Sequence, residues 1–295
     1  MSRVGVVTVT YNSGKVLGAF LDCCERQQRG NWLLIVVDNA SADTTREILR
    51  RRLSGNMHVI ANDSNRGVAE GNNQGIGLAR NLGCDRVLLI NNDVEFSSLL
   101  FAELDSTMNR SSCDALVPRI VFHDQPSIDW FVGGHFEWLW GPDARHDRHI
   151  SKPDPEIVGV RHIDYAPTCC MLVKCSVFDA IGLMDERYFV YWDDTDFCYR
   201  MHKAGITLLI DANIVMSHKV SSLTGGVSTD FFLRYHHRNQ IYYVRKHFGH
   251  LVLAYTLIMS ILKAALRVLV RGDSFRQFVL RLRSMNEGLH LPLGH

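Results

Sequence analysis

The sequence predicts an α/β fold with a mostly parallel central sheet flanked by helices, and three observations support that prediction. The first half of the chain alternates short apolar runs with helical segments. The apolar runs are continuous and rich in β-branched residues, as in parallel strands that are covered on both faces. Polar residues follow each run, and ligands of doubly wound sheets bind outside the carboxyl ends of the strands.

Four strands and four helices are expected in this first half. The strands are predicted at 3–10, 32–38, 57–62 and 86–92. The helices are predicted at 14–28, 43–52, 67–81 and 97–109. Asp43 is the expected N-cap residue of the helix at 43–52, and Ser97 that of the helix at 97–109.

The second half is less regular. Residues 114–182 indicate mixed strands around a loop that is rich in proline and charge near 141–155, and "CCMLVK" is a further apolar strand. From Thr229 onward the pattern becomes helical, with three helices expected before the last residues.

Composition and charge exclude several classes of protein. The chain has 295 residues, 46% of them hydrophobic, and a net charge of +1, which gives no general attraction for nucleic acid. Its eight cysteines include two adjacent pairs and form no CxxC motif, which indicates small core residues in a reducing cytosol. We expect no signal peptide, and the apolar run 251–262 is shorter than the ~18 residues that cross a bilayer.

Polar residues follow all four predicted strands of the first half. These clusters are "TYN" at 10–12, "DNAS" at 38–41, "NDSNRG" at 62–67 and "NND" at 91–93. A single cluster would be explained by ordinary turn chemistry. Four clusters at one edge of a sheet favour a site for a polyhydroxylated or heterocyclic ligand.

A second cluster lies in "YFVYWDDTDFCYR" at 188–200, where Asp193, Asp194 and Asp196 follow several aromatic residues. A helix is expected to begin here, and its dipole favours anions at its first turn. One aspartate would serve as an N-cap. Three of them beside a stacking platform that includes Tyr191 and Trp192 favour a general base that acts on a sugar hydroxyl.

His218 is a third candidate, because it ends a short apolar strand and leads into a Ser/Gly loop. Most lone histidines are structural, but this position also suits a metal ligand. A phosphate-binding P-loop is excluded, because "NSGKVL" has the wrong spacing and Val16 stands where Ser or Thr is required.

Five motifs, in order, resemble the inverting glycosyltransferases of family 2, and in particular their bacterial rhamnosyltransferase-like branch. They are "VVTVTYN", "VVDNASAD", "NRGVAEGNNQGI", "LLINNDV" and "YWDDTDFCYR", within a likeness that covers about residues 4–246. The resemblance implies a GT-A catalytic domain at 1–228. Its nucleotide-sugar-binding half is expected at 1–112, its acceptor-binding half at 113–228, and a C-terminal helical extension at 229–295.

The resemblance also implies the residues of the site. Asp194, or Asp193 beside it, is the expected catalytic base, and Tyr191 and Trp192 are the expected acceptor-binding residues. Asp93 and His218 are expected to ligate Mg²⁺ or Mn²⁺. The expected nucleotide-sugar-binding residues are Thr10, Tyr11, Asn12, Asp38, Asn65, Arg66, Gly67, Asn72, Asn91, Asn92 and Asp93. Asn91 departs from the family's first D-x-D acid, and Thr168-Cys169 replaces its small Gly-Ala step.

The implied reaction moves a sugar, with rhamnose as one candidate, from a dTDP- or UDP-linked donor to a hydroxyl of a saccharide or lipid-linked acceptor. The implied setting is bacterial surface polysaccharide synthesis in the cytoplasm. Two alternatives stay open. A sugar-1-phosphate nucleotidyltransferase would need a basic glycine-rich loop after the first strand, and the three aspartates argue against a non-catalytic nucleotide-sugar-binding subunit.

The predicted helix near 251–272 carries Lys263, Arg267 and Arg271 as one basic stripe, opposite aliphatic residues. Such a helix either packs on the domain with a solvated basic face or lies in an anionic membrane interface. The residues favour neither, and the resemblance favours peripheral membrane contact.

Overall fold

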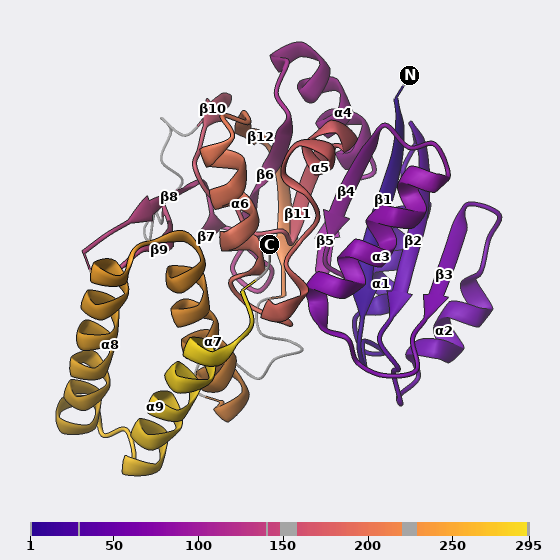
Figure 1. Cartoon of the computed structure of the whole chain (residues 1–295). Helices are drawn as coiled ribbons and strands as arrows, with labels where there is room; N and C mark the ends of the chain where they lie inside the picture. The colour runs from indigo at the N-terminus through magenta and orange to yellow at the C-terminus, as the bar shows by residue number, and fades with distance from the viewer. Residues whose placement is uncertain (1, 29, 140, 148–157, 220–228, 294–295) are drawn as a thin grey trace.

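The computed structural model describes residues 2–28, 30–139, 141–147, 158–219 and 229–293. Within them the central sheet has the strand order β10-β12-β6-β11-β4-β1-β2-β3, with β5 paired to β12 and β7 paired to β6 (Figure 1). Its strands are β1 Arg3–Thr10, β2 Asn31–Asp38, β3 Met57–Ala61, β4 Arg86–Ile90, β5 Val94–Phe96, β6 Ala115–Phe122, β7 Asp129–Phe131, β10 Val160–His162, β11 Cys170–Lys174 and β12 Leu208–His218.

The first half is parallel, as expected. Strand β1 pairs in parallel with β2 and β4, and β2 pairs in parallel with β3. The helices of this half are α1 Leu17–Glu25, α2 Thr45–Arg52, α3 Gly67–Asn81 and α4 Leu100–Ser111. The parallel sheet predicted from the continuous apolar runs is therefore confirmed. Helices α1 and α4 begin three residues later than predicted.

The two N-cap assignments are wrong. Helix α2 is capped at Thr44, and Asp43 instead accepts hydrogen bonds from the backbone N–H groups of Gly14 and Thr45. Asp43 therefore ties the first loop to the start of α2. Helix α4 is capped at Leu99, and the Ser97 hydroxyl accepts a hydrogen bond from the Leu99 N–H.

Beyond β4 the sheet is mixed. Strand β11 lies between β4 and β6 and is antiparallel to both, whereas β12 is parallel to β6. Parallel neighbours need a crossover, usually a helix. The described residues between β6 and β11 contain only short strands, among them the ribbon of β8 (Gly134–Glu137) and β9 (Asp143–His146), so β11 enters in the opposite direction.

Glycines in α3 set its distance from the sheet. A Cβ atom on Gly75 would lie 2.2 Å from Val7 Cγ1, and one on Gly71 would lie 2.8 Å from Val9 Cγ1. These glycines are four residues apart and face β1, so the helix packs closely on the strand. The glycine-rich segment "GVAEGNNQGIG" thus serves helix–sheet packing.

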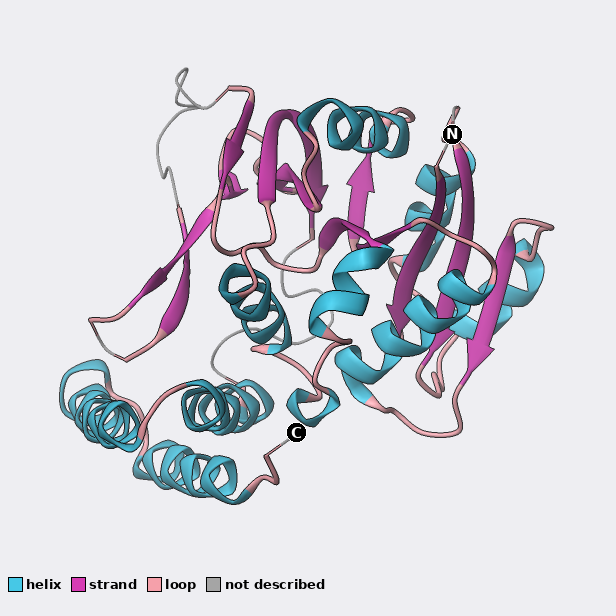
Figure 2. Ribbon diagram, turned by 45° about the horizontal axis from the view of Figure 1, so that its top comes forward, coloured by secondary structure: helices cyan, strands magenta, loops and turns pink. Residues whose placement is uncertain are grey.

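The remaining helices lie in the second half of the chain. They are α5 Cys175–Ile181, the short 3₁₀ helix η1 Glu186–Tyr188, α6 Asp193–Lys203, α7 Asp230–His247, α8 His250–Arg271 and α9 Phe275–His290. Figure 2 shows α7, α8 and α9 packed together at one end of the molecule, far from β3. Tyr242, Tyr243 and Val244 of α7 form a second apolar cluster with Tyr188 and Trp192. The division of the chain into domains at 1–228 and 229–295 stays a prediction.

Helix α8 confirms the helix predicted near 251–272. It has 22 residues, and within the described part of the chain it is the one helix whose length and composition would allow it to cross a membrane. The apolar run 251–262 is shorter than a bilayer span, as stated above, but the whole helix is long and apolar enough. All eight cysteines are free, seven of them buried and Cys175 partly buried, as expected for core residues.

Candidate functional site

The carboxyl ends of β1 and β2 lie side by side at one edge of the sheet. The register pairs Thr10 with Asp38, and the Thr10 hydroxyl donates to Asp38 Oδ1 at 3.0 Å. The other carboxylate oxygen receives Arg46 Nε at 2.8 Å, and Ser41 donates through both its hydroxyl and its N–H. Asp38 is 1% exposed, so its carboxylate is a buried acceptor that joins the ends of β1 and β2.

The loop after β1 offers a ring to solvent. Asn12 has a φ of 52°, accepts a hydrogen bond from Ala42 N at 2.8 Å and donates its own N–H to Ser41 Oγ at 2.9 Å. These bonds fix the loop against the end of β2. Tyr11 stays 48% exposed beside it, where a flat heterocycle could stack.

The loop before α3 holds Asn65, Arg66 and Gly67. Asn65 Oδ1 accepts from the Gly67 N–H at 3.0 Å, and Arg66 Nη1 lies 2.7 Å from Glu70. That ion pair is exposed and therefore weak, which leaves the guanidinium free to meet an anion. Gly67 has a φ of 86°, and a Cβ there would lie 2.4 Å from Phe189 O, so this position needs glycine.

Asn72 contacts Met184, and its predicted place near the ribose and diphosphate stays a prediction. Its side chain is buried, with Nδ2 3.6 Å from the sulfur of Met184. The next residue, Asn73, exchanges hydrogen bonds with both backbone groups of Met184 and donates to Glu186. These α3 side chains therefore hold the segment that precedes the aspartate cluster.

The "NND" cluster joins three strands. Asn91 donates its N–H to Cys169 O at 3.0 Å, and Asn92 Nδ2 donates to Val9 O at 2.6 Å. Asn92 Oδ1 is buried and has no hydrogen-bond partner among the described residues. Asp93 is 7% exposed, and its Oδ1 lies 3.1 Å from Nε2 of His218, which is distant in sequence and also buried.

Asp93 and His218 fit two neighbouring ligands of one divalent cation. Two cis ligands at octahedral metal–ligand distances of about 2.1 Å lie about 3 Å apart, close to the distance between Asp93 Oδ1 and His218 Nε2. The Trp130 ring packs edge-on against His218, with centroids 4.7 Å apart, and holds the imidazole in place. No group of three or more acidic, His or Cys side chains suited to a metal occurs in the described residues.

The first turn of α6 brings Asp194 to Tyr165. The Tyr165 hydroxyl donates to Asp194 Oδ2 at 2.9 Å, while Thr195 donates its N–H to Asp194 Oδ1 at 2.7 Å. Burial raises the pKa of Asp194, and these hydrogen bonds oppose that rise. Burial and then the charge of Asp194 raise the pKa of Asp193 to about 8. The pair therefore takes up a proton at higher pH than exposed carboxylates do, and the charge of Asp194 favours the neutral form of Asp193.

Cys169 connects the two carboxylate sites. Burial raises the pKa of its thiol, and the charges of Cys170, Asp93 and Asp194 raise it further. Both aspartates therefore lie within electrostatic range of one residue at the start of β11. The Thr168-Cys169 step departs from the family's pattern, and Cys169 O accepts the N–H of Asn91, two residues before the predicted metal ligand.

Tyr165 is a site residue that the sequence did not predict. Its one signal is its place in "DYAPTCC", directly before the strand that pairs with the "NND" strand. Replacing Tyr165 with Phe removes one donor to Asp194 without altering the ring. We expect kcat to fall by about tenfold, because one hydrogen bond to a charged group is worth roughly 1.5–3 kcal/mol. Steady-state kinetics on both proteins checks this, and an unchanged kcat would contradict it.

The two predicted acceptor-binding aromatics differ. Trp192 is 4% exposed, its Nε1 donates to His236 Nδ1 at 3.2 Å, and its ring packs on Tyr243. The prediction that Trp192 is a stacking platform is therefore not supported, since a positive φ of 70° turns its side chain toward α7. Tyr191 is partly exposed beside Phe232, with ring centroids 5.2 Å apart, and its acceptor role stays a prediction.

Asp196 is structural. It is fully buried and bonds to Tyr188, Arg200, Lys246 and His247 at 2.7–3.1 Å. Burial alone would raise its pKa, but the His247 hydrogen bond and the nearby Arg200 and Lys246 charges hold that pKa well below its usual range. A carboxylate held so firmly is unsuited to accept a substrate proton.

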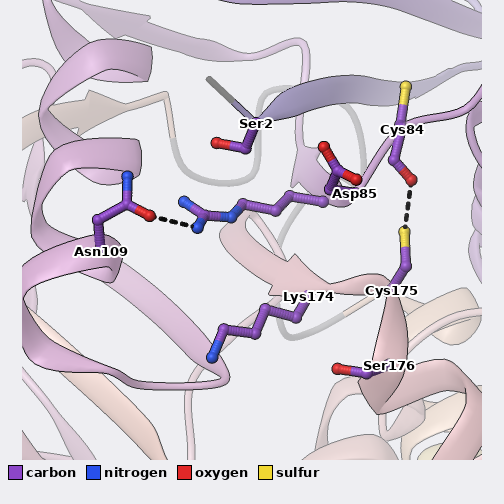
Figure 3. A pocket seen from close by; sticks show the side chains of 8 residues that line it. Ser2, Cys84, Asp85, Asn109, Lys174, Cys175 and Ser176 are labelled. Carbon is purple, nitrogen blue, oxygen red and sulfur yellow. Dashed lines mark hydrogen bonds between the residues drawn. The ribbon is translucent and has the colours of Figure 1, made fainter.

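A pocket lies at the opposite end of the sheet, by the start of β4 and the end of β11 (Figure 3). Its cations are paired: Arg86 bonds to Asn109 at 2.6 Å and to Asp105, and Lys174 lies 3.2 Å from Asp114. The pocket therefore offers little to an anionic ligand, and the carboxyl edge stays the better candidate site.

Known relatives of this chain are sugar transferases. The chain is 27% identical over 181 residues to the low-salt glycan biosynthesis hexosyltransferase Agl10 of Haloferax volcanii, which covers 59% of this chain and 54% of that protein. It is 26% identical over 262 residues to the N-acetylglucosaminyl-diphospho-decaprenol L-rhamnosyltransferase of Mycobacterium tuberculosis, covering 83% and 85% respectively. It is 24% identical over 220 residues to the dTDP-rhamnosyl transferase RfbF of Shigella flexneri, covering 74% and 70%.

Solved structures confirm the GT-A fold. GalNAc-T7 with UDP, GalNAc and Mn²⁺ superposes with a TM-score of 0.67 at 13% identity, over 99% of this chain and 56% of that one. The mannosyltransferase PcManGT from Pyrobaculum calidifontis, with GDP-Man and Mn²⁺, gives a TM-score of 0.57 at 14% identity, over 99% of this chain and 81% of that one. The family model described as glycosyl transferase family 2 matches residues 5–182, from β1 to just beyond α5. Since this match covers more than half of its length, the chain belongs to glycosyl transferase family 2.

Proposed function

We propose that this chain is an inverting glycosyltransferase that moves a sugar from a nucleoside diphosphate to an acceptor hydroxyl. The observation that carries the proposal is the approach of two carboxylate sites to Cys169, the Asp93–His218 pair and the Asp194–Tyr165 pair. One site suits a diphosphate-bound cation and the other suits a proton acceptor. Such a pairing is what displacement of a diphosphate by a hydroxyl requires.

The proposed donor is dTDP- or UDP-linked, with rhamnose as the leading sugar. Two relatives are named as rhamnosyltransferases, one of them specifically for dTDP-rhamnose. The exposed Tyr11 ring and the Arg66 guanidinium at the carboxyl edge can meet a base and a diphosphate. We propose a saccharide or lipid-linked acceptor, cell-envelope polysaccharide synthesis and a cytoplasmic location, in keeping with these relatives.

Asp93 and His218 would hold Mg²⁺ or Mn²⁺ in this proposal. When bound, the cation stabilises the negative charge of the leaving diphosphate. Asp194 accepts the proton of the acceptor hydroxyl while that oxygen forms a bond to the anomeric carbon. The carbon–oxygen bond to the diphosphate breaks on the opposite side, and a single displacement inverts the configuration.

A panel of nucleotide sugars tests the function. The protein with Mg²⁺ or Mn²⁺ is expected to release free nucleoside diphosphate from one donor class, faster when saccharide acceptors are present. Consumption of pyrophosphate would indicate a sugar-1-phosphate nucleotidyltransferase. Donor binding in a thermal shift, without release of diphosphate, would indicate a non-catalytic binding subunit.

We propose in addition that α8 docks on an anionic membrane. Small or hydroxyl-bearing residues face the protein, since Thr256, Ser260 and Ala264 are its buried positions. Large aliphatic residues face outward instead. The exposed set is Leu251, Ile258, Ile261, Leu262, Leu266, Leu269 and Val270. A soluble helix normally shows the reverse arrangement, and Arg267 and Arg271 add attraction to anionic headgroups.

Glutamates at Leu262 and Leu266, which are 51% and 56% exposed, are expected to abolish docking. Pelleting with anionic vesicles should fall by about tenfold or more, because each leucine otherwise buries apolar area worth roughly 1.5–3 kcal/mol. Leu53→Glu on the exposed end of α2 is the matched control, at 61% exposure, and should pellet like wild type. Equal pelleting of all three proteins would refute the membrane contact.

A further inference from the structure

We propose that Asn239 of α7 is a positioning residue of the active site, which holds the 188–192 loop that leads into the base at Asp194. This inference rests on the proposed function of Asp194. It makes the helix at the start of the C-terminal extension part of the catalytic machinery rather than an appendage.

The loop before α6 has an unusual backbone. Phe189, Tyr191 and Trp192 have φ angles of 64°, 61° and 70°, although none of them is glycine. Non-glycine residues adopt this region rarely, and bulky aromatic ones more rarely still. Such conformations persist only where the surrounding structure holds them, and they concentrate at functional sites.

Asn239 stabilises this loop conformation through hydrogen bonds. Its side chain is fully buried, and Nδ2 lies 2.8 Å from each of three backbone oxygens, those of Tyr188, Val190 and Tyr191. The two N–H protons of this amide are shared among three carbonyls, of which Tyr188 O also accepts from Val190 N and Arg238 Nη2. Buried carbonyls without donors are costly, so the loop conformation depends on this side chain.

The orientation of the amide is fixed by its neighbours. The three carbonyl oxygens only accept hydrogen bonds, while Arg238 Nε lies 2.8 Å from Asn239 Oδ1 and only donates. Arg238 also donates through Nη2 to Arg187 O at 2.7 Å and to Tyr188 O at 2.8 Å. Two consecutive α7 residues therefore bind most of the backbone oxygens between 187 and 191.

The same loop also contacts the donor side. Val68, at the start of α3, donates its N–H to Phe189 O at 2.6 Å, next to the close approach at Gly67. A second anchor lies beyond the loop, where Asp196 bonds to Lys246 and His247 of α7. The loop thus connects the nucleotide edge, the base and α7, and a shift of it moves Asp194 relative to the donor.

The test uses two isosteric substitutions in the full-length protein. Asn239→Asp replaces a donor with an acceptor facing three carbonyls. Gln240→Glu adds the same charge at the next buried position, whose side chain faces Ser260 of α8. We expect Asn239→Asp to lower kcat by at least about tenfold with an unchanged KM for the donor, since misplaced catalytic groups cost up to about 10²-fold. Gln240→Glu should stay within about twofold of wild type.

Hydrogen exchange supplies a second readout that needs no activity. Backbone amides in 188–193 should exchange faster in Asn239→Asp than in Gln240→Glu. Arg238→Met keeps the alkyl stem at a partly buried position and serves if Asn239→Asp fails to fold; it should show the same two effects more weakly. Equal kcat and equal exchange in the Asn239 and Gln240 variants would overturn the proposal. If wild type transfers no sugar, the proposed function fails, and the exchange data alone decide whether Asn239 holds the loop.

Discussion

Replacement of Asp194 with Asn is expected to lower the rate of sugar transfer by about 10²–10⁴-fold, the usual contribution of a general base. The amide keeps the shape of the carboxylate and can still accept a hydrogen bond from Tyr165, but it cannot take a proton. Nucleotide binding should be unchanged, because the predicted nucleotide contacts lie at the ends of β1, β2 and β4 and at the start of α3, outside α6. Donor titration and acceptor kinetics on the same preparation separate the two effects.

Asp193→Asn is the matched control. The charge of Asp194 favours the neutral form of Asp193, which an amide resembles, so the loss of Asp193 should cost far less than the loss of Asp194. If Asp194→Asn kept more than a few per cent of wild-type turnover while Asp193→Asn did not, the roles of the two residues would be reversed.

The pH dependence of kcat/KM follows from the same pair. Burial raises the pKa of Asp194, so the base loses its proton above the usual carboxylate range and activity should rise with pH on the acid side. The charge of Asp194 raises the pKa of Asp193, whereas burial is the main cause of the raised pKa of Asp194, so Asp193→Asn should leave this acid limb in place. A limb that moves clearly to lower pH would contradict burial as the main cause of the raised pKa of Asp194.

The first half of the fold could be predicted because its signals are local. Continuous β-branched runs define β1 to β4, and parallel pairing then brings Thr10 beside Asp38 without further information. The second half gave no such signal, since the antiparallel direction of β11 depends on the route of the chain between β6 and β11. The periodicity of hydrophobic residues predicts the type of an element, but not its direction in the sheet.

Site residues that directly follow a strand could be predicted from the sequence. Site residues whose place depends on contacts between distant segments could not. Asp93 and His218 lie on distant segments and were joined by family resemblance before the structure placed them 3.1 Å apart. Trp192 was misjudged because an aromatic residue in a loop can face solvent or core, and a left-handed backbone turned it inward. Tyr165 and Asn239 act through side chains that no spacing rule connects to Asp194.

Metal binding is expected to depend strongly on the nucleotide. Among the described residues, one carboxylate and one imidazole are the candidate ligands, too few for a hard cation that prefers about six oxygen-rich positions. Nucleotide-free protein should therefore bind Mn²⁺ weakly, and saturating dTDP or UDP should tighten it by about tenfold or more. Titration calorimetry with and without the nucleotide measures both affinities.

Asp93→Asn should remove this enhancement, whereas Glu95→Gln, two residues further on the same segment, should keep it because Glu95 pairs with Lys219 at 2.6 Å. Linkage provides an internal check, since Mn²⁺ must tighten nucleotide binding by the same factor as the nucleotide tightens Mn²⁺ binding. Tight Mn²⁺ uptake by the nucleotide-free protein that Asp93→Asn abolishes would show a complete protein-built site. In that case the diphosphate would not be the source of the missing ligands, and the shared-cation geometry proposed for Asp93 and His218 would be wrong.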